Sequence, residues 1–374
     1  MKLLIVGGCG LQVQPAINYL LEQDEISTII IGDINIDAAL KLVEDQNNSK
    51  LLAQHIDALN HKQLVQAISE VDVVFNASGP YHLLGVKILK ATIEAGKHYV
   101  DFCDDTEPTL EMLELSEQAA AKGVTAIVGL GASPGATNLI SMHCAAMLDQ
   151  TEEVNMYWHI GKGEPSGPAV LDHLLHIMSG DVIQFIDGER KHVPALSGLE
   201  PFKMPGIDEE MHSVFVGHPE PSTLPDYIPG VRQVVSKFTN VPDELSFFMA
   251  MQEFGLFSTE PVDVKGNKVA PRSMLIELLA KIAKEEEVAE GVDTGSCIVI
   301  DVKGQKDGKA TTVRIIGRGN MPMLTSMPAA LGVVLLARGE ITRRGVFPPE
   351  GCIKPESIME PLEAMGVSPE IHIL

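Results

Sequence analysis

Apolar runs alternate with helix-like segments through the first third of the chain. Five runs rich in Val, Ile and Leu predict strands, and the segments between them repeat apolar residues at helical spacing. Runs that are apolar on both faces indicate a parallel sheet covered by helices on both sides, and the alternation is typical of a doubly wound α/β fold. The predicted strands are 2–8, 27–33, 71–78, 98–103 and 124–130, and the predicted helices are 15–23, 36–46, 85–96 and 109–123.

The pattern changes after residue 132. A loop and helix are predicted over 133–148 and an alternating strand over 152–161. Strands are also predicted over 244–258 and, as a hairpin with a D-G turn, over 295–319. The proline-rich stretch 217–230 is predicted to be a structured loop without a helix. We therefore expect an α+β region with an antiparallel or mixed sheet, a face of which would suit a two-fold dimer.

The last part of the chain is predicted to be helical again. The segment 326–341 is a long apolar helix that would pack well on the first sheet. The chain is therefore expected to divide into three segments, with boundaries at 1–132, 133–322 and 323–374.

Composition and charge narrow the functional classes. The chain has 374 residues, of which 45% are hydrophobic, and no apolar run approaches the ~18 residues that span a bilayer. The N-terminus has no signal-peptide pattern. The 28 basic and 51 acidic residues give a net charge of −23, which argues against nucleic acid and anionic membranes as partners. The same charge would attract cationic amines, although solubility alone is a sufficient explanation.

Cysteine and histidine spacing argues against disulfides and metal sites. The five cysteines are scattered, which predicts reduced thiols and a cytoplasmic location. The histidines His159, His173, His176 and His212 lack the spacing of known zinc sites, so no metal is predicted.

A glycine-rich turn follows the first predicted strand. Gly8 and Gly10 match the first two glycines of G-x-G-x-x-G, the first for a tight turn and the second for close approach of a pyrophosphate. Val13 replaces the third glycine, which serves helix–sheet packing. Gly8, Gly10 and Leu11, which follows them in the turn, predict a dinucleotide site in a Rossmann fold. A plain tight turn is the alternative.

Asp33 ends the second predicted strand, where a carboxylate binds the ribose hydroxyls of NAD and repels the extra phosphate of NADP. No arginine follows it closely, so NAD is favoured over NADP. Asp33 is also a candidate N-cap for the next helix.

Polar residues follow three successive predicted strands. Carboxyl ends of parallel strands meet at one edge of a sheet, where ligands bind in open α/β folds. Asn76, Gly79 and Pro80 are expected near the nicotinamide. The other residues at this edge are Tyr81, His82, Asp101, Cys103, Asp104, Asp105, Ser133, Gly135, Thr137 and Asn138. Ordinary loop capping is the simpler explanation for His82, Asp105 and Ser133 taken singly.

These motifs resemble the saccharopine dehydrogenase family. The similarity is clear over 6–16, 76–105 and 129–145, and the segment 337–353 is similar to the ending of lysine 6-dehydrogenases in that family. The resemblance implies an N-terminal Rossmann domain, an inserted substrate-binding and dimerisation domain, and a C-terminal return to the first. It also implies hydride transfer between NAD(P) and a carbon bearing an amine. Val13 departs from the family pattern, in which glycine is common.

This chemistry requires an acid–base group. Hydride leaves a carbon only when the attached amine is neutral, so a base must take its proton and an acid must later protonate the leaving group. Asp104 or Asp101 is the candidate base, with Tyr81 as a supporting donor. Ser133, Gly135, Thr137 and Asn138, joined by Thr223 and Arg232 of the loop 217–232, are candidate substrate-binding residues, with Arg232 suited to a carboxylate. A salt-bridged surface loop is the alternative for 217–232.

The leading interpretation is an NAD-dependent oxidoreductase of amines or amino acids, similar to lysine 6-dehydrogenase. One alternative is reductive condensation of an amine with a carbonyl compound, giving saccharopine or a carboxylated polyamine. Another is a nucleotide-binding protein without turnover. A homodimer is the expected assembly.

Overall fold

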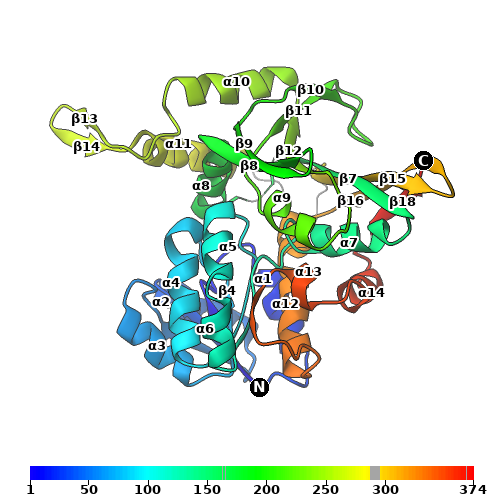
Figure 1. Cartoon of the computed structure of the whole chain (residues 1–374). Coiled ribbons are helices and arrows are strands. Elements are labelled where there is room, and N and C mark those ends of the chain that lie inside the picture. The colour runs from blue at the N-terminus through cyan, green and yellow to red at the C-terminus, as the bar shows by residue number, and fades with distance from the viewer. Residues whose placement is uncertain (162, 165, 287–294, 368) are drawn as a thin grey trace. The chain divides into compact units, whose positions relative to one another are not determined.

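The computed structural model describes residues 1–161, 163–164, 166–286, 295–367 and 369–374, and its contacts divide the chain into two compact units (Figure 1). The first unit comprises Met1–Met142 and Met321–Ser368, and the second comprises His143–Asn320 and Pro369–Leu374. No helix in the described ranges is both long and apolar enough to cross a bilayer.

A seven-stranded parallel sheet forms the centre of the first unit. Its order is β17-β6-β5-β4-β1-β2-β3, so the order reverses between β1 and β4 as in a Rossmann fold. The predicted doubly wound sheet is confirmed. The strands are β1 (Lys2–Val6), β2 (Thr28–Asp33), β3 (Leu51–His55), β4 (Val73–Asn76), β5 (His98–Asp101), β6 (Thr125–Ile127) and β17 (Gly345–Phe347).

Helices pack on this sheet in two groups. The N-terminal α1 contacts α12 from the far end of the chain, while α3, α4 and α5 contact one another in sequence (Figure 1). The helices are α1 (Gln14–Leu21), α2 (Ile36–Gln46), α3 (His61–Ser69), α4 (Tyr81–Glu94), α5 (Thr106–Leu113), α6 (Ser116–Ala121), α12 (Met321–Ala337), α13 (Pro349–Cys352) and α14 (Glu356–Ala364). The boundary to the second unit falls inside α7 (Ala136–Ala145).

Two features of the first unit differ from the sequence prediction. No element was predicted over the region that forms β3 and α3. The single helix expected over 109–123 is two helices, α5 and α6. At the start of α6, the hydroxyl of Ser116 accepts the N–H of Val346 in β17 and donates to its carbonyl. Gly96 and Gly123, the last residues of the predicted helices 85–96 and 109–123, have positive φ.

The second unit is built on a nine-stranded mixed sheet with the order β10-β11-β12-β7-β15-β16-β18, to which the hairpin β8–β9 is added at β12. The neighbours β7 and β12 are parallel and the other pairs are antiparallel. The strands are β7 (Gln150–His159), β8 (Asp181–Ile186), β9 (Glu189–Pro194), β10 (Glu200–Phe202), β11 (Met211–Phe215), β12 (Gln233–Asn240), β15 (Cys297–Lys306), β16 (Lys309–Arg318) and β18 (Glu370–Ile373).

The predicted hairpin over 295–319 is confirmed as β15–β16. Asp307 and Gly308 both have positive φ, which a two-residue turn of the primed type requires. The segment 323–374, expected to return as a whole to the first unit, divides near its end. Its last strand, β18, pairs with β16 in the second unit.

Two predictions for the second unit are wrong. The strand expected over 244–258 is the helix α10 (Pro242–Glu253), which begins with Pro242 and two acidic residues, a strong helix start. The stretch 217–230, expected to lack helix, forms the short helices α9 (Glu220–Thr223) and η1 (Leu224–Asp226), each with proline in its first turn. The remaining elements are α8 (Pro168–Ile177), α11 (Pro271–Glu286) and the hairpin β13 (Val262–Val264) and β14 (Asn267–Val269).

Candidate active site

The glycine turn joins β1 to α1 at the point where the strand order reverses. Gly7 has a φ of +77°, and a Cβ there would lie 2.7 Å from Cα of Ser78. Gly10 donates its N–H to the carbonyl of Gly7 at 3.0 Å and is exposed. In the described residues, the backbone N–H groups of Leu11 and Gln12 make no hydrogen bond. This exposed turn before a helix N-terminus fits the pyrophosphate of a dinucleotide.

Two residues of the turn were not singled out from the sequence. Gly7, not Gly8, adopts the left-handed conformation, and its place directly after β1 is the signal that was available. The side chain of Gln14 donates to the carbonyls of Gly8 and Gly10 at 3.1 and 2.9 Å and so closes the turn. No sequence rule assigns that contact to a glutamine.

Val13 lies at the N-cap position of α1. Its side chain is 1% exposed and belongs to the hydrophobic core of the first unit. The substitution of the third glycine therefore adds apolar packing on the helix side of the turn.

Asp33 ends β2 beside this turn. One carboxylate oxygen accepts the N–H of Cys9 at 3.1 Å and the other accepts the N–H of Asn35 at 2.9 Å. The half-exposed carboxylate is therefore fixed where a ribose would be recognised. The N-cap alternative is wrong for Asp33, because the side chain of Asn35 caps α2 through the N–H of Ala38.

A chain of buried hydrogen bonds joins the carboxyl ends of β4 and β5. The hydroxyl of Ser78 donates to the side-chain oxygen of Asn76 at 2.6 Å, and the amide of Asn76 donates to the hydroxyl of Tyr99 at 3.0 Å. Tyr99 then donates to Asp101 at 2.6 Å. Tyr99 was missed in the sequence because it lies inside a strand, where an aromatic residue reads as core.

Asp101 extends this chain to the segment after β6. Its second oxygen accepts the N–H groups of Cys103 at 3.0 Å and Gly129 at 2.7 Å. Complete burial is the main cause that raises the pKa of Asp101 to about 6, against the three hydrogen bonds, which lower it. Asp101 thus holds the two loops that carry Asp104 and Ser133.

Tyr81 begins α4 after the cis Gly79–Pro80 bond and is 6% exposed. Its hydroxyl donates to the carbonyl of Asn76 at 2.9 Å, and its ring contacts Phe102 edge-on. Burial raises the pKa of Tyr81 well above its usual value. The hydroxyl of Tyr81, which was expected to donate to a substrate, therefore donates to the backbone of the fold instead.

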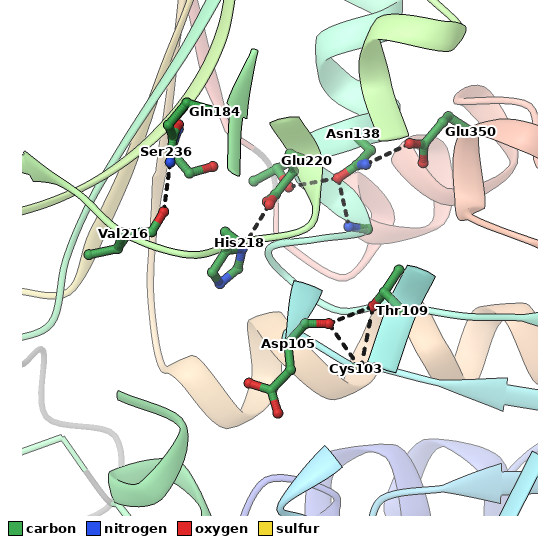
Figure 2. A network of polar contacts seen from close by, with 12 residues as sticks. Cys103, Asp105, Thr109, Asn138, Gln184, Val216, His218, Glu220, Ser236 and Glu350 are labelled. Carbon is green, nitrogen blue, oxygen red and sulfur yellow. Dashed lines mark hydrogen bonds and ion pairs between the residues drawn. The ribbon is translucent and has the colours of Figure 1, made fainter. Parts of the chain in front are cut away.

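The three residues after Phe102 differ in their surroundings. Cys103 is buried, with Thr109 donating to its sulfur, and burial raises the pKa of its thiol well above the usual range (Figure 2). Asp105 is 1% exposed and accepts the N–H of His82 at 3.1 Å, so it stabilises the N-terminus of α4. Asp104 between them is half-buried, and its charge contributes to raising the pKa of Asp101.

The loop Ser133–Asn138 is held by a buried amide. Gly135 has a φ of +120°, and a Cβ there would lie 2.4 Å from the nitrogen of Gly131. Asn138 accepts the N–H of Gly135 at 3.0 Å and donates to Glu350 at 2.9 Å (Figure 2). Thr137 also donates to Asn138, at 3.2 Å. Of the four predicted substrate residues in this loop, Ser133 is half-buried and the other three are buried.

The proline-rich loop of the second unit has two different halves. Asp226 forms an exposed ion pair with Arg190 at 2.8 Å, and Arg190 also donates to the carbonyl of Ser222. Arg232 is exposed, while Thr223 is 4% exposed. In this half of the loop, Asp226 therefore lies in a surface ion pair, as the alternative interpretation of the loop expected.

The other half contains a buried pair. Nδ1 of His218 lies 2.7 Å from a carboxylate oxygen of Glu220, with the two side chains 4% and 0% exposed (Figure 2). The ring of Trp158 from β7 lies against His218. The pairing of His218 with Trp158 has no sequence signal, because the two residues are brought together by strands far apart in the chain.

Comparison with known proteins identifies the family. Residues 3–127 match the saccharopine dehydrogenase NADP binding domain, and residues 131–367 match the saccharopine dehydrogenase C-terminal domain. The carboxynorspermidine synthase of Vibrio cholerae is 26% identical, with 98% of this chain and 96% of the relative covered. The carboxyaminopropylagmatine dehydrogenase of Synechocystis is 23% identical, with coverage of 98% and 96%.

A solved structure has the same fold. The apo saccharopine dehydrogenase (L-Glu forming) of Saccharomyces cerevisiae superposes with a TM-score of 0.73 at 16% identity, covering 100% of this chain and 99% of that one. The two family domains together span nearly all of the chain and include the glycine turn and the three strand ends. The protein therefore belongs to the saccharopine dehydrogenase family and is an NAD(P)-dependent oxidoreductase.

Proposed function

We propose that this enzyme joins an amine to a carbonyl compound and reduces the resulting imine with a nicotinamide cofactor. The observation that carries the proposal is the nearly full-length match to two relatives whose names describe a carboxylated polyamine and a carboxylated agmatine derivative. Lysine oxidation with release of ammonia, the leading interpretation of the sequence, has no comparable support. The net charge of −23 suits a cationic amine substrate.

A product assay separates the two reactions. The purified chain would be given NADH or NADPH with a panel of amines (L-lysine, agmatine, 1,4-diaminobutane) and a carbonyl compound that bears a carboxylate. Condensation predicts oxidation of the cofactor and a secondary amine, detected by mass spectrometry. Oxidative deamination predicts instead that an amine alone reduces NAD(P)+ and releases ammonia. No turnover in either direction with the panel would contradict the proposal.

The first unit would hold the cofactor, and when bound the cofactor supplies the hydride. Gly8, Gly10 and Leu11 would bind the pyrophosphate and Asp33 the ribose, with Asn76, Gly79 and Pro80 beside the nicotinamide. We further propose NAD in preference to NADP. The support is Asp33, whose carboxylate ends β2 and repels a 2′-phosphate. The name of the matched domain favours NADP, which makes this choice a direct test.

Asp104 is proposed as an acid–base residue in preference to Asp101 and Tyr81. The carboxylate of Asp101 accepts three hydrogen bonds and the hydroxyl of Tyr81 donates to a carbonyl, so both are committed to the fold. The half-buried Asp104 would supply the proton that carries away the carbonyl oxygen as water. Ser133, with Gly135, Thr137, Asn138, Thr223 and Arg232, remains proposed for the substrate, and 133–322 remains the proposed substrate domain.

A homodimer in the cytoplasm is the proposed state of the enzyme. All five cysteines are free thiols, which suits a reducing compartment. Exposed apolar side chains gather on α10, α11 and the hairpin β13–β14, and on α11 they repeat every four residues as Met274, Leu278 and Ile282. Such a stripe suits self-association with a second copy better than the sheet face that the sequence suggested. Light scattering of the wild type and of Leu278→Glu would test the dimer, and a monomeric wild type would exclude it.

A further inference from the structure

The second unit contains a buried histidine–carboxylate pair outside the cofactor-binding residues. His218 and Glu220 follow β11, and Nδ1 of the histidine lies 2.7 Å from Oε2 of the glutamate (Figure 2). His218 is 3% exposed and Glu220 is fully buried. Burying a carboxylate carries a desolvation cost, so a pair of this kind in a loop suggests a use beyond stability.

Aromatic rings surround the histidine on two sides. The ring of Trp158 lies 5.1 Å from that of His218, and the ring of His173 lies 5.8 Å away from it in a nearly perpendicular arrangement. Trp158 is itself held by Phe238, with ring centroids 5.6 Å apart. The ring of His218 is therefore fixed in orientation by Glu220 and by its neighbours.

Two polar atoms of this cluster have no partner. Among the described residues, Nε2 of His218 makes no hydrogen bond, and the indole N–H of Trp158 is buried without one. Buried polar groups are nearly always hydrogen-bonded in folded proteins. Trp158 is only 8% exposed, so its unpaired indole N–H points to a ligand or an ordered water beside His218.

The chemistry of the pair selects the ligand. Because the carboxylate of Glu220 accepts Nδ1–H, the opposite nitrogen of a neutral His218 carries a lone pair. A lone pair backed by a buried carboxylate favours a cationic nitrogen and disfavours an anion. A primary ammonium group donates to this nitrogen, and after it loses its proton the lone pair of the neutral amine can accept the indole N–H of Trp158.

We propose that His218 binds the substrate ammonium group and removes its proton. This inference rests on the proposed condensation, in which the amine must be neutral before its lone pair attacks the carbonyl carbon. The ammonium proton passes to Nε2, and Glu220 stabilises the imidazolium. The amine nitrogen then forms a bond to the carbonyl carbon while the π pair of the C=O bond moves to the oxygen. The adduct nitrogen gives up one N–H proton, which Asp104 transfers to the oxygen, and the imidazolium of His218 returns the second proton, so that the oxygen leaves as water. The product of these steps is the iminium that hydride reduces. Glu220 acts as a positioning residue.

Trp158 provides the readout, because it is the one tryptophan of the chain. Its fluorescence reports on this cluster without cofactor or turnover. Agmatine and 1,4-diaminobutane would be titrated into the wild type, His218→Gln and Glu220→Gln. Gln at 218 keeps a donor toward Glu220 but cannot act as a base. The matched control is His192→Gln, the same change at an exposed position of β9.

The proposal predicts that amine binding changes the emission of the wild type and the control, and that both variants bind about tenfold more weakly. In the full assay, His218→Gln should lower kcat/KM for the amine by about 100-fold, the usual loss for a missing base, with the KM of the cofactor unchanged. For Glu220→Gln, a fall in kcat/KM for the amine with an unchanged KM of the cofactor separates positioning from general loss of structure.

Failure of this inference differs from failure of the proposed function. A wild type that turns over, but whose His218→Gln variant keeps the same amine affinity and kcat/KM, would overturn the role of His218. A wild type without turnover, whose Trp158 still responds to the amines through His218, would overturn the condensation and leave the amine site standing.

Discussion

Each unit buries a carboxylate, and the two are used differently. In the first unit Asp101 accepts hydrogen bonds from Tyr99, Cys103 and Gly129, and Tyr99 in turn accepts one from Asn76. In the second unit Glu220 orients His218, whose other ring nitrogen makes no hydrogen bond in the described residues. The first arrangement fixes the backbone, and the second presents a reactive atom.

The difference shows that burial alone does not tell whether a carboxylate stabilises the fold or takes part in acid–base chemistry. A carboxylate whose oxygens are filled by backbone and hydroxyl donors stabilises loop geometry, whatever its pKa. A carboxylate that holds an imidazole with a nitrogen left over resembles the base–orienter arrangement of acid–base sites. The hydrogen bonds that Asp101 accepts argue against a role as the base, although its pKa alone would recommend it.

The largest effect is expected at Gly7, where the backbone leaves no room for a side chain. Gly7→Ala would place a Cβ 2.7 Å from the backbone of Ser78 at a φ of +77°. Adopting that φ costs a non-glycine residue about 1–2 kcal/mol before any clash. We expect a loss of more than about 2 kcal/mol in the free energy of unfolding, measured with urea, and greatly weakened cofactor binding.

Gly96→Ala is the matched control. Its φ of +67° is similar, but an added Cβ would have nothing within 4 Å. We expect a loss of about 1 kcal/mol from the backbone conformation alone. Equal losses in the two variants would show that the contact with Ser78 does not constrain the turn.

The next effect concerns Asp101, whose carboxylate accepts three hydrogen bonds. The pKa of Asp101 is raised from 3.8 to about 6, so between these values the folded state binds more protons than the unfolded state. The contribution of Asp101 to stability is therefore fully present below pH 4 and is lost as the pH rises to about 6. Asp101→Asn should lack this loss.

The measurement is the difference in unfolding free energy between Asp101→Asn and the wild type, followed from about pH 4 to pH 7. Taking the difference cancels the titration of all other groups. The variant should gain relative to the wild type as the pH rises and then level off. A difference that is constant over this range would mean that Asp101 is ionised throughout, as an ordinary salt-bridged acid would be.

A smaller effect tests cofactor choice. Asp33→Ala removes the carboxylate fixed by Cys9 and Asn35 and should weaken NAD binding about tenfold while improving the relative use of NADP. The ratio of kcat/KM for the two reduced cofactors measures it. Asp37→Ala, an exposed acid on the following helix, is the control. A wild type that prefers NADPH, with a ratio unmoved by Asp33→Ala, would reverse the assignment.

The first unit was largely predictable because its signals are local. Each strand is a continuous apolar run, and parallel strands bring their carboxyl ends to one edge, so Asn76 and Asp101 could be placed together from the sequence. The roles of these residues could not be predicted. Hydrogen-bond saturation depends on Tyr99 and on the N–H of Gly129, and neither has a sequence signal.

The second unit was less predictable because its pairings are long-range. Sheet neighbours such as β7 and β12 lie far apart in the chain, so the contact of Trp158 with His218 follows from no local pattern. The aromatic content of 244–258 favoured strands, whereas Pro242 and the acids after it started α10. Capping signals outweighed composition there.

The smallest expected effect separates the two halves of the proline-rich loop. Asp226→Asn removes an ion pair with Arg190 in which both side chains are largely exposed, at 63% and 41%. Exposed pairs contribute about 0–1 kcal/mol, so stability should fall by no more than about 0.5 kcal/mol and the KM for the amine should not change. His218→Gln, eight positions earlier, should instead lose most of the activity toward the amine. If Asp226→Asn raised the KM as much as His218→Gln does, recognition would extend along the whole loop. The contrast between a buried, unsaturated pair and an exposed, screened one would then not explain which charges bind substrate.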